Sequence, residues 1–450
     1  MAFFRCNRHQ YLIRKKAFQG KSGSWVVFGL RQFRKLMEKS MKLDLWLLGI
    51  CSSRVFTYLV FMTYAAALPV MQKEWGMSAA TAGSISSGFH IGYAFSLLFF
   101  STVADRVGAK RSFLLSNFLT VVVSLLFAAL ARGYYSGLIF YTLIGVSIGG
   151  VYTPGLMMIA ERYPSKGRGT AVGVFIASTS LSYALSLGVS GAALPWGGYR
   201  TAFLLTCLGP LVGFLLAWTT LSSTPNRIFP RGREQRFSTA VVRNTSAMLL
   251  IGAYSLHSWE LLGMWAWTPA FLSACLAVRG SGVWTAVGSG AFLVSLFHLM
   301  GVAASLSMGT LSDKLGRTSV ILFIGSISAA CSFGIGWLIG FPISLIIFIG
   351  MIYAFSALGD SPILSAGITE SVEPSYLGAA FALRGLLGFG AGALSPFVFG
   401  IVLDWRNPTF QSTGIYATWG WSYSVLGLGG LGVVITAYVL HRKHTLVGEF

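Results

Sequence analysis

The sequence is poor in charge, and most of the charge it has is basic. Of its 450 residues only 13 are Asp or Glu, against 33 Lys or Arg, while hydrophobic residues make up 54% of the chain. The mean hydropathy is +0.70. This composition excludes an ordinary soluble globular protein and indicates a polytopic membrane protein.

Cysteine pairs and enzyme-like residue sets are also missing. The five cysteines show neither metal-ligand spacing nor the framework of a small secreted protein. No glycine-rich phosphate loop follows a strand pattern, and no nucleophile stands with a base. We therefore expect no enzyme, no ATP-driven pump, no metal site and no cofactor. The net charge of +20 is spread over short segments between apolar runs, which argues against a nucleic-acid partner.

Long apolar runs dominate the chain from Leu45 onward. Each has about 17 to 27 residues, close to the ~20 that a helix needs to cross a ~30 Å hydrocarbon core. They lie near residues 45–71, 80–103, 112–131, 137–160, 169–194, 201–221, 247–271, 285–308, 319–338, 343–368, 377–402 and 419–440. The sequence thus predicts an all-α protein with twelve transmembrane helices in a lipid bilayer.

Basic residues alternate between the two sides of these predicted helices. With the N-terminus inside, the inner segments hold 26 Lys and Arg and the outer loops hold five. Because positive charge favours the cytoplasmic side, we expect a multi-pass protein of the cell membrane with both termini, residues 1–44 and 441–450, in the cytoplasm.

The first 44 residues form a basic tail with 11 Lys and Arg. The tail lacks the apolar core of a signal peptide. It is expected either to bind the lipid surface, where each basic residue contributes about 1 kcal/mol, or to reflect a misassigned start, with Met37 or Met41 as the true first residue.

A charged loop between apolar runs occurs twice, 208 residues apart. Each copy has an acid, a basic residue directly after it, a glycine three positions beyond the acid, and further basic charge. The copies comprise Asp105, Arg106, Gly108, Lys110 and Arg111, and Gly309, Asp313, Lys314, Gly316 and Arg317. We call these two loops the clasps. They predict salt bridges across helix ends and to the opposite half that hold the cytoplasmic side shut. The simpler interpretation is that their positive charge only fixes topology.

Other residues repeat at the same distance. His90 matches His298, and Pro154 matches Pro362. The chain therefore reads as a parallel duplication of six-helix bundles, residues 45–221 and 247–440, joined by a cytoplasmic linker at 222–246. A transporter whose site lies between two similar bundles fits this pattern.

The clasps resemble the signature loops of the major facilitator superfamily of secondary transporters, which link helices 2 and 3 and helices 8 and 9. The first copy departs from the pattern with Ser101, where the family has glycine, and the second keeps Gly309. The resemblance implies two pseudo-symmetric six-helix bundles that move a solute by alternating access. It identifies no substrate.

Ionisable residues inside the apolar runs are functional candidates, because an ionisable group in the bilayer interior costs several kcal/mol. They are Arg54, His90, His257, Glu260, His298, Asp360 and Arg384. Predicted helices 3, 6, 9 and 12 have none, so we expect those four to face lipid and the others to surround a polar chamber. At ~1.5 Å per residue most of the seven lie about 12 to 22 Å into the membrane.

The residue types suggest roles. Arg54 and Arg384 offer a permanent charge and a planar fork suited to an anionic substrate. Glu260 and Asp360 suit proton coupling. His257 and Glu260 share a helix face and predict a proton relay, and the repeat-related His90 and His298 are expected to contact substrate or protons, unless they only bond neighbouring helices.

These observations predict a monomeric secondary transporter for a small polar solute, an organic or inorganic anion coupled to protons by symport or antiport. Two alternatives stay open. In the first, the two arginines and two carboxylates pair internally, and the transporter moves a neutral or cationic substrate. In the second, the protein is a transport-dead membrane sensor or scaffold that acts through its basic tail.

Overall fold

The structure is a computed structural model, and it describes residues 44–228, 239–373, 376–410, 414 and 416–447. The predicted basic tail lies almost wholly outside these residues. The regular elements of the described part are all helices, with no strand among them, as the apolar runs predicted.

The first half of the described chain, which we call the N-half, contains the first six predicted spans. Its elements are α3 (Leu45–Thr57), η1 (Tyr58–Val60), α4 (Thr63–Glu74), α5 (Ala79–Val107), α6 (Ala109–Leu130), α7 (Tyr134–Ile148), η2 (Gly149–Val151), α8 (Tyr152–Arg162) and α9 (Ser165–Leu221). The fourth span is interrupted at η2 because Pro154 has no N–H to donate to the carbonyl four residues earlier, which loosens the helix there. The sequence predicted the span but not its interruption.

The second half, the C-half, begins after the linker. Its elements are α10 (Thr239–Arg243), α11 (Thr245–Ala277), α12 (Val283–Leu315), α13 (Arg317–Ile335), η4 (Gly336–Leu338), α14 (Ile343–Ser371), α15 (Leu377–Arg406) and α17 (Gly420–Val447). Most bounds fall within a few residues of the predicted runs.

The 57-residue α9 contains two predicted spans. A straight helix of that length would measure about 85 Å, more than twice the thickness of a hydrocarbon core. The chain reverses near Gly198, whose φ of +66° is a conformation that glycine adopts without strain. Pro195, just before it, cannot continue the hydrogen-bond ladder. The fifth and sixth predicted helices are thus the two arms of α9.

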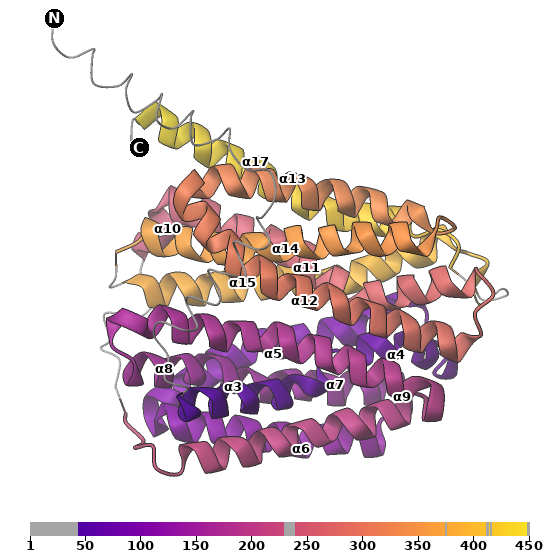
Figure 1. Cartoon of the computed structure of the whole chain (residues 1–450), viewed down its shortest axis with the longest axis horizontal. Coiled ribbons are helices and arrows are strands. Elements are labelled where there is room, and N and C mark those ends of the chain that lie inside the picture. The colour runs from indigo at the N-terminus through magenta and orange to yellow at the C-terminus, as the bar shows by residue number, and fades with distance from the viewer. Residues whose placement is uncertain (1–43, 229–238, 374–375, 411–413, 415, 448–450) are drawn as a thin grey trace, which may run out of the picture. The chain divides into compact units, whose positions relative to one another are not determined.

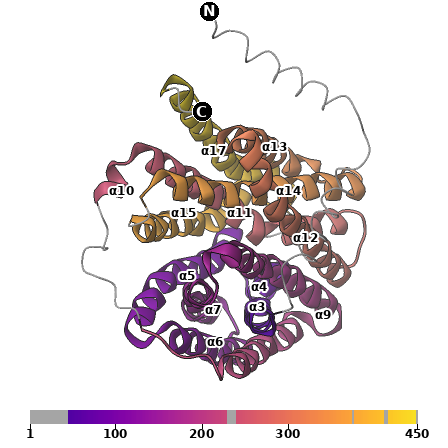
Figure 2. The same cartoon turned by 60° about the vertical axis from the view of Figure 1, so that its left-hand side comes forward.

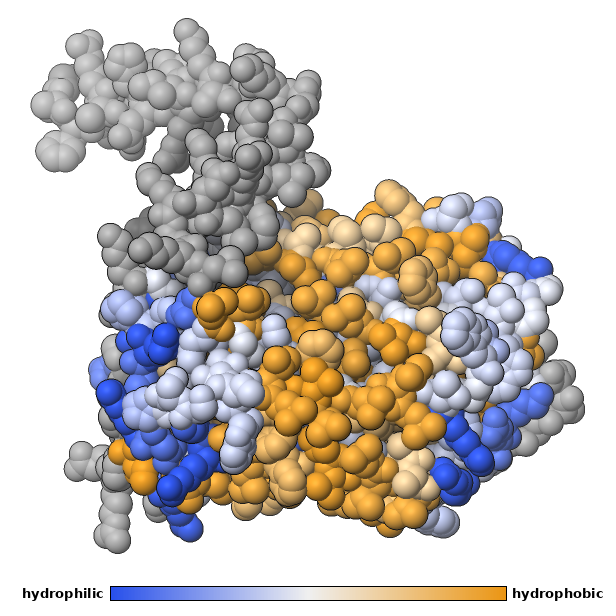
Figure 3. All heavy atoms as spheres, turned by 60° about the horizontal axis from the view of Figure 1, so that its bottom comes forward, coloured by the Kyte–Doolittle hydropathy of each residue, from blue (hydrophilic) through white to orange (hydrophobic). Residues whose placement is uncertain are grey.

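The helices have the length and surface of membrane spans. Ten helical stretches among the described residues are long and apolar enough to cross a membrane, and one of them is the double-span α9. The 33-residue α11 falls outside this set because Glu260, His257 and three tryptophans lower its hydropathy. Figure 3 shows the result on one face: an apolar band runs across the helices and is flanked by polar residues at both ends. Twelve spans are consistent with this count.

The two halves pack along two helix pairs. Figures 1 and 2 show α3 to α9 gathered on one side and α11 to α17 on the other, with α5 beside α15 and α9 beside α12. Following the predicted topology, we call the end near Ala79 and Arg406 the outer end and the opposite one the inner end. Glycines let the backbones touch at the outer end: a Cβ on Gly400 would lie 2.3 Å from the Ala79 carbonyl oxygen, and one on Gly191 would lie 2.6 Å from that of Gly288.

The clasps are tight turns of the same form. Gly108 alone separates α5 from α6, and Gly316 alone separates α12 from α13. Their φ angles are +93° and +90°, where a side chain is strained and glycine is not. The repeated glycine of the motif therefore makes the one-residue turn possible in each half.

Candidate functional site

Arg54 lies on α3 inside an aromatic cage. Its side chain is buried, and Nη1 donates a 2.8 Å hydrogen bond to the carbonyl of Phe175 on α9. The guanidinium carbon lies 4.3 Å from the ring centre of Phe175, 5.0 Å from Tyr152 on α8 and 5.4 Å from Tyr58. Ring faces stabilise a cation without neutralising it, so the positive charge remains available.

Arg384 on α15 has a similar environment in the C-half. It is 8% exposed, and Nη1 donates to Ser365 Oγ on α14 at 2.6 Å. Its guanidinium carbon lies 4.2 Å from the ring centre of Tyr254 on α11 and 4.8 Å from that of Phe381. This side chain too is held by rings and a neutral acceptor.

The two cages occupy equivalent places in the duplicated fold. In the N-half the cage is built from the first, fourth and fifth spans, and in the C-half from the seventh, tenth and eleventh. The two arginines come from spans that are not counterparts. Arg54 lies on the first span, whereas Arg384 lies on the eleventh, which is the counterpart of the fifth. The first span thus contributes the arginine Arg54 to its cage, whereas the seventh contributes the ring of Tyr254.

Neither arginine pairs with a carboxylate. Among the ion pairs between described residues none includes Arg54 or Arg384, and the Nε atom of each is buried without a hydrogen-bond partner. A buried guanidinium with an unused donor is costly unless something else completes its bonding. The alternative in which Glu260 and Asp360 neutralise the arginines is therefore not the arrangement in this structure.

Asp360 pairs with a histidine instead. His257 Nδ1 lies 2.8 Å from Asp360 Oδ1, and both side chains are almost fully buried. His257 also contacts the ring of Tyr254 at 5.5 Å. Because Tyr254 lies against Arg384 on its other side, Arg384, Tyr254, His257 and Asp360 form a continuous row through the C-half.

Glu260 bonds residues outside this row. Its carboxylate accepts a 2.9 Å hydrogen bond from Ser328 on α13 and packs against Gly430 on α17, where a Cβ would come within 2.7 Å of Oε2. The helices that hold Glu260, α13 and α17, are the ninth and twelfth spans. Among the described residues His257 and Glu260 bond different partners, and the relay between them stays a prediction. Helical spacing placed them near one another but did not fix the face toward which Glu260 turns.

The two repeat-related histidines lie at opposite ends of an aromatic cluster that crosses between the halves. His90 on α5 contacts Phe61 at 5.9 Å, and His298 on α12 contacts Tyr183 and Trp265 at 5.6 Å each. Phe61, Tyr183 and Trp265 lie within 6.4 Å of one another, centre to centre. The cluster lies about 10 Å outward of Arg54, seven residues along the same span, and forms a wall of rings between the halves.

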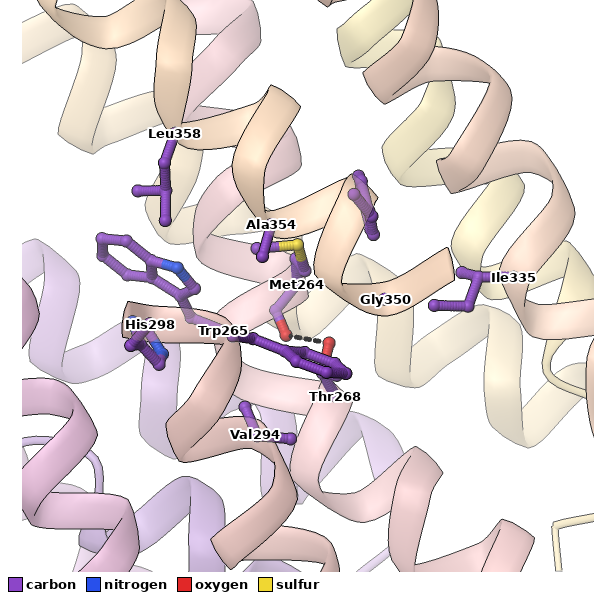
Figure 4. Close-up of a pocket in the computed structure, with 11 residues that line it drawn as sticks. Met264, Trp265, Thr268, Val294, His298, Ile335, Gly350, Ala354 and Leu358 are labelled. Atoms are coloured by element: carbon purple, nitrogen blue, oxygen red, sulfur yellow. Dashed lines mark hydrogen bonds between the residues drawn. The ribbon is translucent and has the colours of Figure 1, made fainter. Parts of the chain in front are cut away.

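A small cavity borders this wall inside the C-half. Figure 4 shows Trp265 and His298 at one side of it, with Gly350 and Ile335 at the other. Its volume of about 10 Å³ has room for roughly one water molecule. His298 Nδ1 has no protein partner. The cavity is far too small for a metabolite, and the arginines do not line it.

The clasps bind different neighbours. At the first, Lys110 Nζ donates to the carbonyl of Thr224 at 2.8 Å, and Asn226 Nδ2 donates to the carbonyl of Val107, so this clasp holds the start of the linker. At the second, Arg317 pairs with Asp313 at 2.6 Å and with Glu370 at 2.7 Å. These pairs stay within the C-half and do not reach the opposite half in this state.

The sequence analysis selected the charged residues of this candidate site but not the rings around them. Phe61, Phe175, Tyr183 and Tyr254 come from spans that are rich in aromatics, and nothing distinguishes them there. One signal was present. Tyr254 lies three residues before His257 and so shares its helix face.

Comparisons with known proteins agree with this architecture. The model of the Major Facilitator Superfamily matches residues 50–396. A probable 4-methylmuconolactone transporter of Cupriavidus pinatubonensis is 23% identical over 85% of this chain and 87% of its own length. The hexuronate transporter of Bacillus subtilis is 24% identical over 88% and 93%. The solved structure of a D-xylose–proton symporter superposes with a TM-score of 0.67 at 16% identity and covers 88% of this chain and 95% of its own. The chain belongs to the major facilitator superfamily, and it is a membrane transporter rather than an enzyme.

Proposed function

We propose that this transporter moves a small organic anion, a carboxylate, together with protons. The observation that carries the proposal is the pair of buried arginines, one in each half, that no carboxylate of the described chain neutralises. A carboxylate that reaches both would join the halves, as alternating access requires.

The chemistry of the two cages favours a carboxylate. In each arginine one Nη atom is held by a neutral oxygen while Nε remains without a partner. Charge-assisted hydrogen bonds from such donors are about twice as strong as neutral ones. The rings of Phe175 and Tyr254 hold each guanidinium in place, which lowers the entropy lost when the anion binds.

Proton coupling is assigned to the pair of His257 and Asp360. The pair is separated from Arg384 only by the ring of Tyr254. An anion bound at Arg384 brings negative charge close to the pair and therefore favours its more protonated form. Because such coupling is reciprocal, a proton on the pair strengthens anion binding by the same factor. This linkage supports symport.

The relatives agree with an anionic substrate. A hexuronate is a carboxylate, and the name of that relative states that it is transported. A proton symporter stands among the similar folds. We further propose that the protein works as a monomer in the cell membrane with its inner end toward the cytoplasm, as the distribution of basic residues predicts.

The test is ligand stabilisation of the purified protein, since a ligand that binds the folded state raises its melting temperature. Small carboxylates, inorganic anions, neutral sugars and organic cations are compared at pH 5.5 and 7.5. We expect one carboxylate class to stabilise the protein, more so at the lower pH. The effect should disappear in Arg54→Ala and Arg384→Ala, and it should persist in Arg132→Ala, an exposed arginine of an outer loop.

Other outcomes assign the protein differently. Stabilisation only by neutral or cationic compounds would make the arginines structural and reject an anionic substrate. A protein that binds a carboxylate but shows no flux in proteoliposomes would be a sensor rather than a transporter.

A further inference from the structure

The first turn of α5 is completed by the opposite half of the protein. The first four N–H groups of a helix have no partner within it. Here the N–H of Thr81 donates to Ser78 Oγ, whereas those of Ala79 and Ala80 donate to the two carboxylate oxygens of Asp404, each at 2.8 Å. Asp404 belongs to α15 in the C-half. One carboxylate thus caps the start of α5 across the seam between the halves.

The position of Asp404 on its own helix is unusual. It lies in the last turn of α15, where the carbonyl groups of the helix carry partial negative charge and an acid is unfavourable. The N-terminus of α5 carries the opposite partial charge. The carboxylate is therefore unfavourable for α15 and favourable for α5, so its stabilising effect depends on contact between the two helices.

A second cross-seam contact meets the same carboxylate. Gln72 at the end of α4 donates from Nε2 to the hydroxyl of Tyr416, and that hydroxyl donates to Asp404 Oδ1 at 3.3 Å. Tyr416 is fixed in its loop by stacking on Phe410, with ring centres 3.8 Å apart, and by a hydrogen bond from Trp419 Nε1 to its carbonyl. Burial raises the pKa of the Tyr416 phenol, which keeps it in the neutral form that donates.

The contacts of Asp404 lie beside the tightest approach of the two helices. A Cβ on Gly400 would lie 2.3 Å from the Ala79 carbonyl oxygen, and one on Gly83 would lie 2.2 Å from that of Pro396. The two hydrogen bonds to Asp404 and the two close glycine approaches between α5 and α15 lie on the outer side of the ring contact between Tyr93 and Phe389. Separation of the halves at the outer end must therefore break both bonds to Asp404.

From this geometry we propose that Asp404 is a latch that holds the outer end shut, with Tyr416 and Gln72 as its second contact. It sets the balance between the inward-facing and outward-facing states and does not touch substrate. The inference goes beyond the proposed anion transport and holds whatever the substrate is. Asp404 is a positioning residue in this sense.

The experiment measures the width of the outer end. Spin labels are attached at Tyr135→Cys in α7 and Phe341→Cys before α14, two exposed outer positions in opposite halves, in full-length protein whose native cysteines are replaced by alanine. Distances are measured by double electron–electron resonance in lipid nanodiscs. Asp404→Ala is compared with the parent and with Glu74→Gln, which removes another carboxylate from the same end without breaking a bond in the latch.

We expect Asp404→Ala to raise the ratio of the long-distance to the short-distance population about tenfold, as the loss of a charged helix cap predicts. Asp404→Asn should give a smaller increase, since an amide has one acceptor oxygen, and Tyr416→Phe a smaller one again. Glu74→Gln should match the parent. Superimposable distributions for Asp404→Ala and the parent would overturn the latch, as would an equal shift in Glu74→Gln. If Asp404→Ala does not fold, the distance distributions of Asp404→Asn and Tyr416→Phe are compared with that of the parent, and distributions identical to the parent would overturn the latch.

Discussion

Replacing Gly400 by alanine should push the transporter toward its outward-facing state. In the present state the added Cβ would lie 2.3 Å from the carbonyl oxygen of Ala79 and 2.6 Å from its carbonyl carbon. Both are backbone atoms and cannot turn aside as a side chain would. An ordinary contact begins near 3.4 Å, so α5 and α15 would have to separate by about 1 Å at this point.

The magnitude follows from that separation. Overpacking of a close helix contact costs about 1–3 kcal/mol, and the cost arises only while the outer end is closed. The equilibrium between the two states should therefore shift by about 5- to 150-fold toward the open outer end. A separation of 1 Å would also stretch the 2.8 Å bonds from Ala79 and Ala80 to Asp404 beyond hydrogen-bonding distance, which adds to the shift.

The assay is the same distance measurement across the outer end, with Gly390→Ala as the control. Gly390 lies on the same helix, and a Cβ there would meet no atom within 4 Å, so this variant changes helix propensity but not the seam. We expect the long-distance population to grow in Gly400→Ala only. Identical distributions for the two variants would refute the idea that backbone contact at the outer end sets the balance of states.

Three further predictions concern the charged residues, and one concerns a turn. Arg54→Lys keeps the charge but loses the planar fork held against the rings, so carboxylate affinity should fall about tenfold, by roughly 1.4 kcal/mol, in a titration followed by thermal shift. Asp360→Asn should abolish the rise in proteoliposome uptake as the pH falls while leaving equilibrium binding at pH 7.5 within a few-fold; an unchanged pH profile would remove the pair from proton coupling. Asp105→Asn should slow uptake without loss of equilibrium binding, and a complete loss of binding would contradict a gating role for the clasp. Gly316→Ala forces alanine to a φ of +90° and should destabilise the protein by about 1–3 kcal/mol, measured as a lower melting temperature than that of Gly390→Ala.

The sequence was most informative where a single physical constraint decides the structure. The length of the apolar runs predicted the spans, because a helix must match the thickness of the bilayer. The two clasps predicted short loops between neighbouring spans, and the structure shows the reason for their repeated glycine at Gly108 and Gly316, whose positive φ makes a one-residue connection possible. The family, and with it the fold, followed from these two signals.

The sequence was less informative about the direction in which side chains point. Glu260 was predicted to take part in proton coupling with Asp360, and that role stays a prediction. Its contacts with Ser328 and Gly430 could not be predicted, since one buried helix presents polar residues to several neighbours. The rings around the arginines come from other spans, and their spacing along the chain carries no trace of that contact. Asp404 was not singled out, because an acid at a helix end looks like a solvated loop residue until its partner helix is known.

The register of α5 against α15 has a mechanical consequence. Ala79 faces Asp404, and Tyr93, 14 residues further along α5, faces Phe389. The two antiparallel helices thus touch at their outer ends and again at the rings of Tyr93 and Phe389, about 20 Å further along α5. Twelve more residues along α5 lead to Asp105, and twelve back along α15 lead to Leu377, the first residue of that helix. A rocking motion that separates the outer ends of the two helices and brings their inner ends together would move the carboxylate of Asp105 toward the first turn of α15, where the N–H groups have no partner within the helix. One motion would then exchange a capped helix end on one side of the membrane for a capped end on the other.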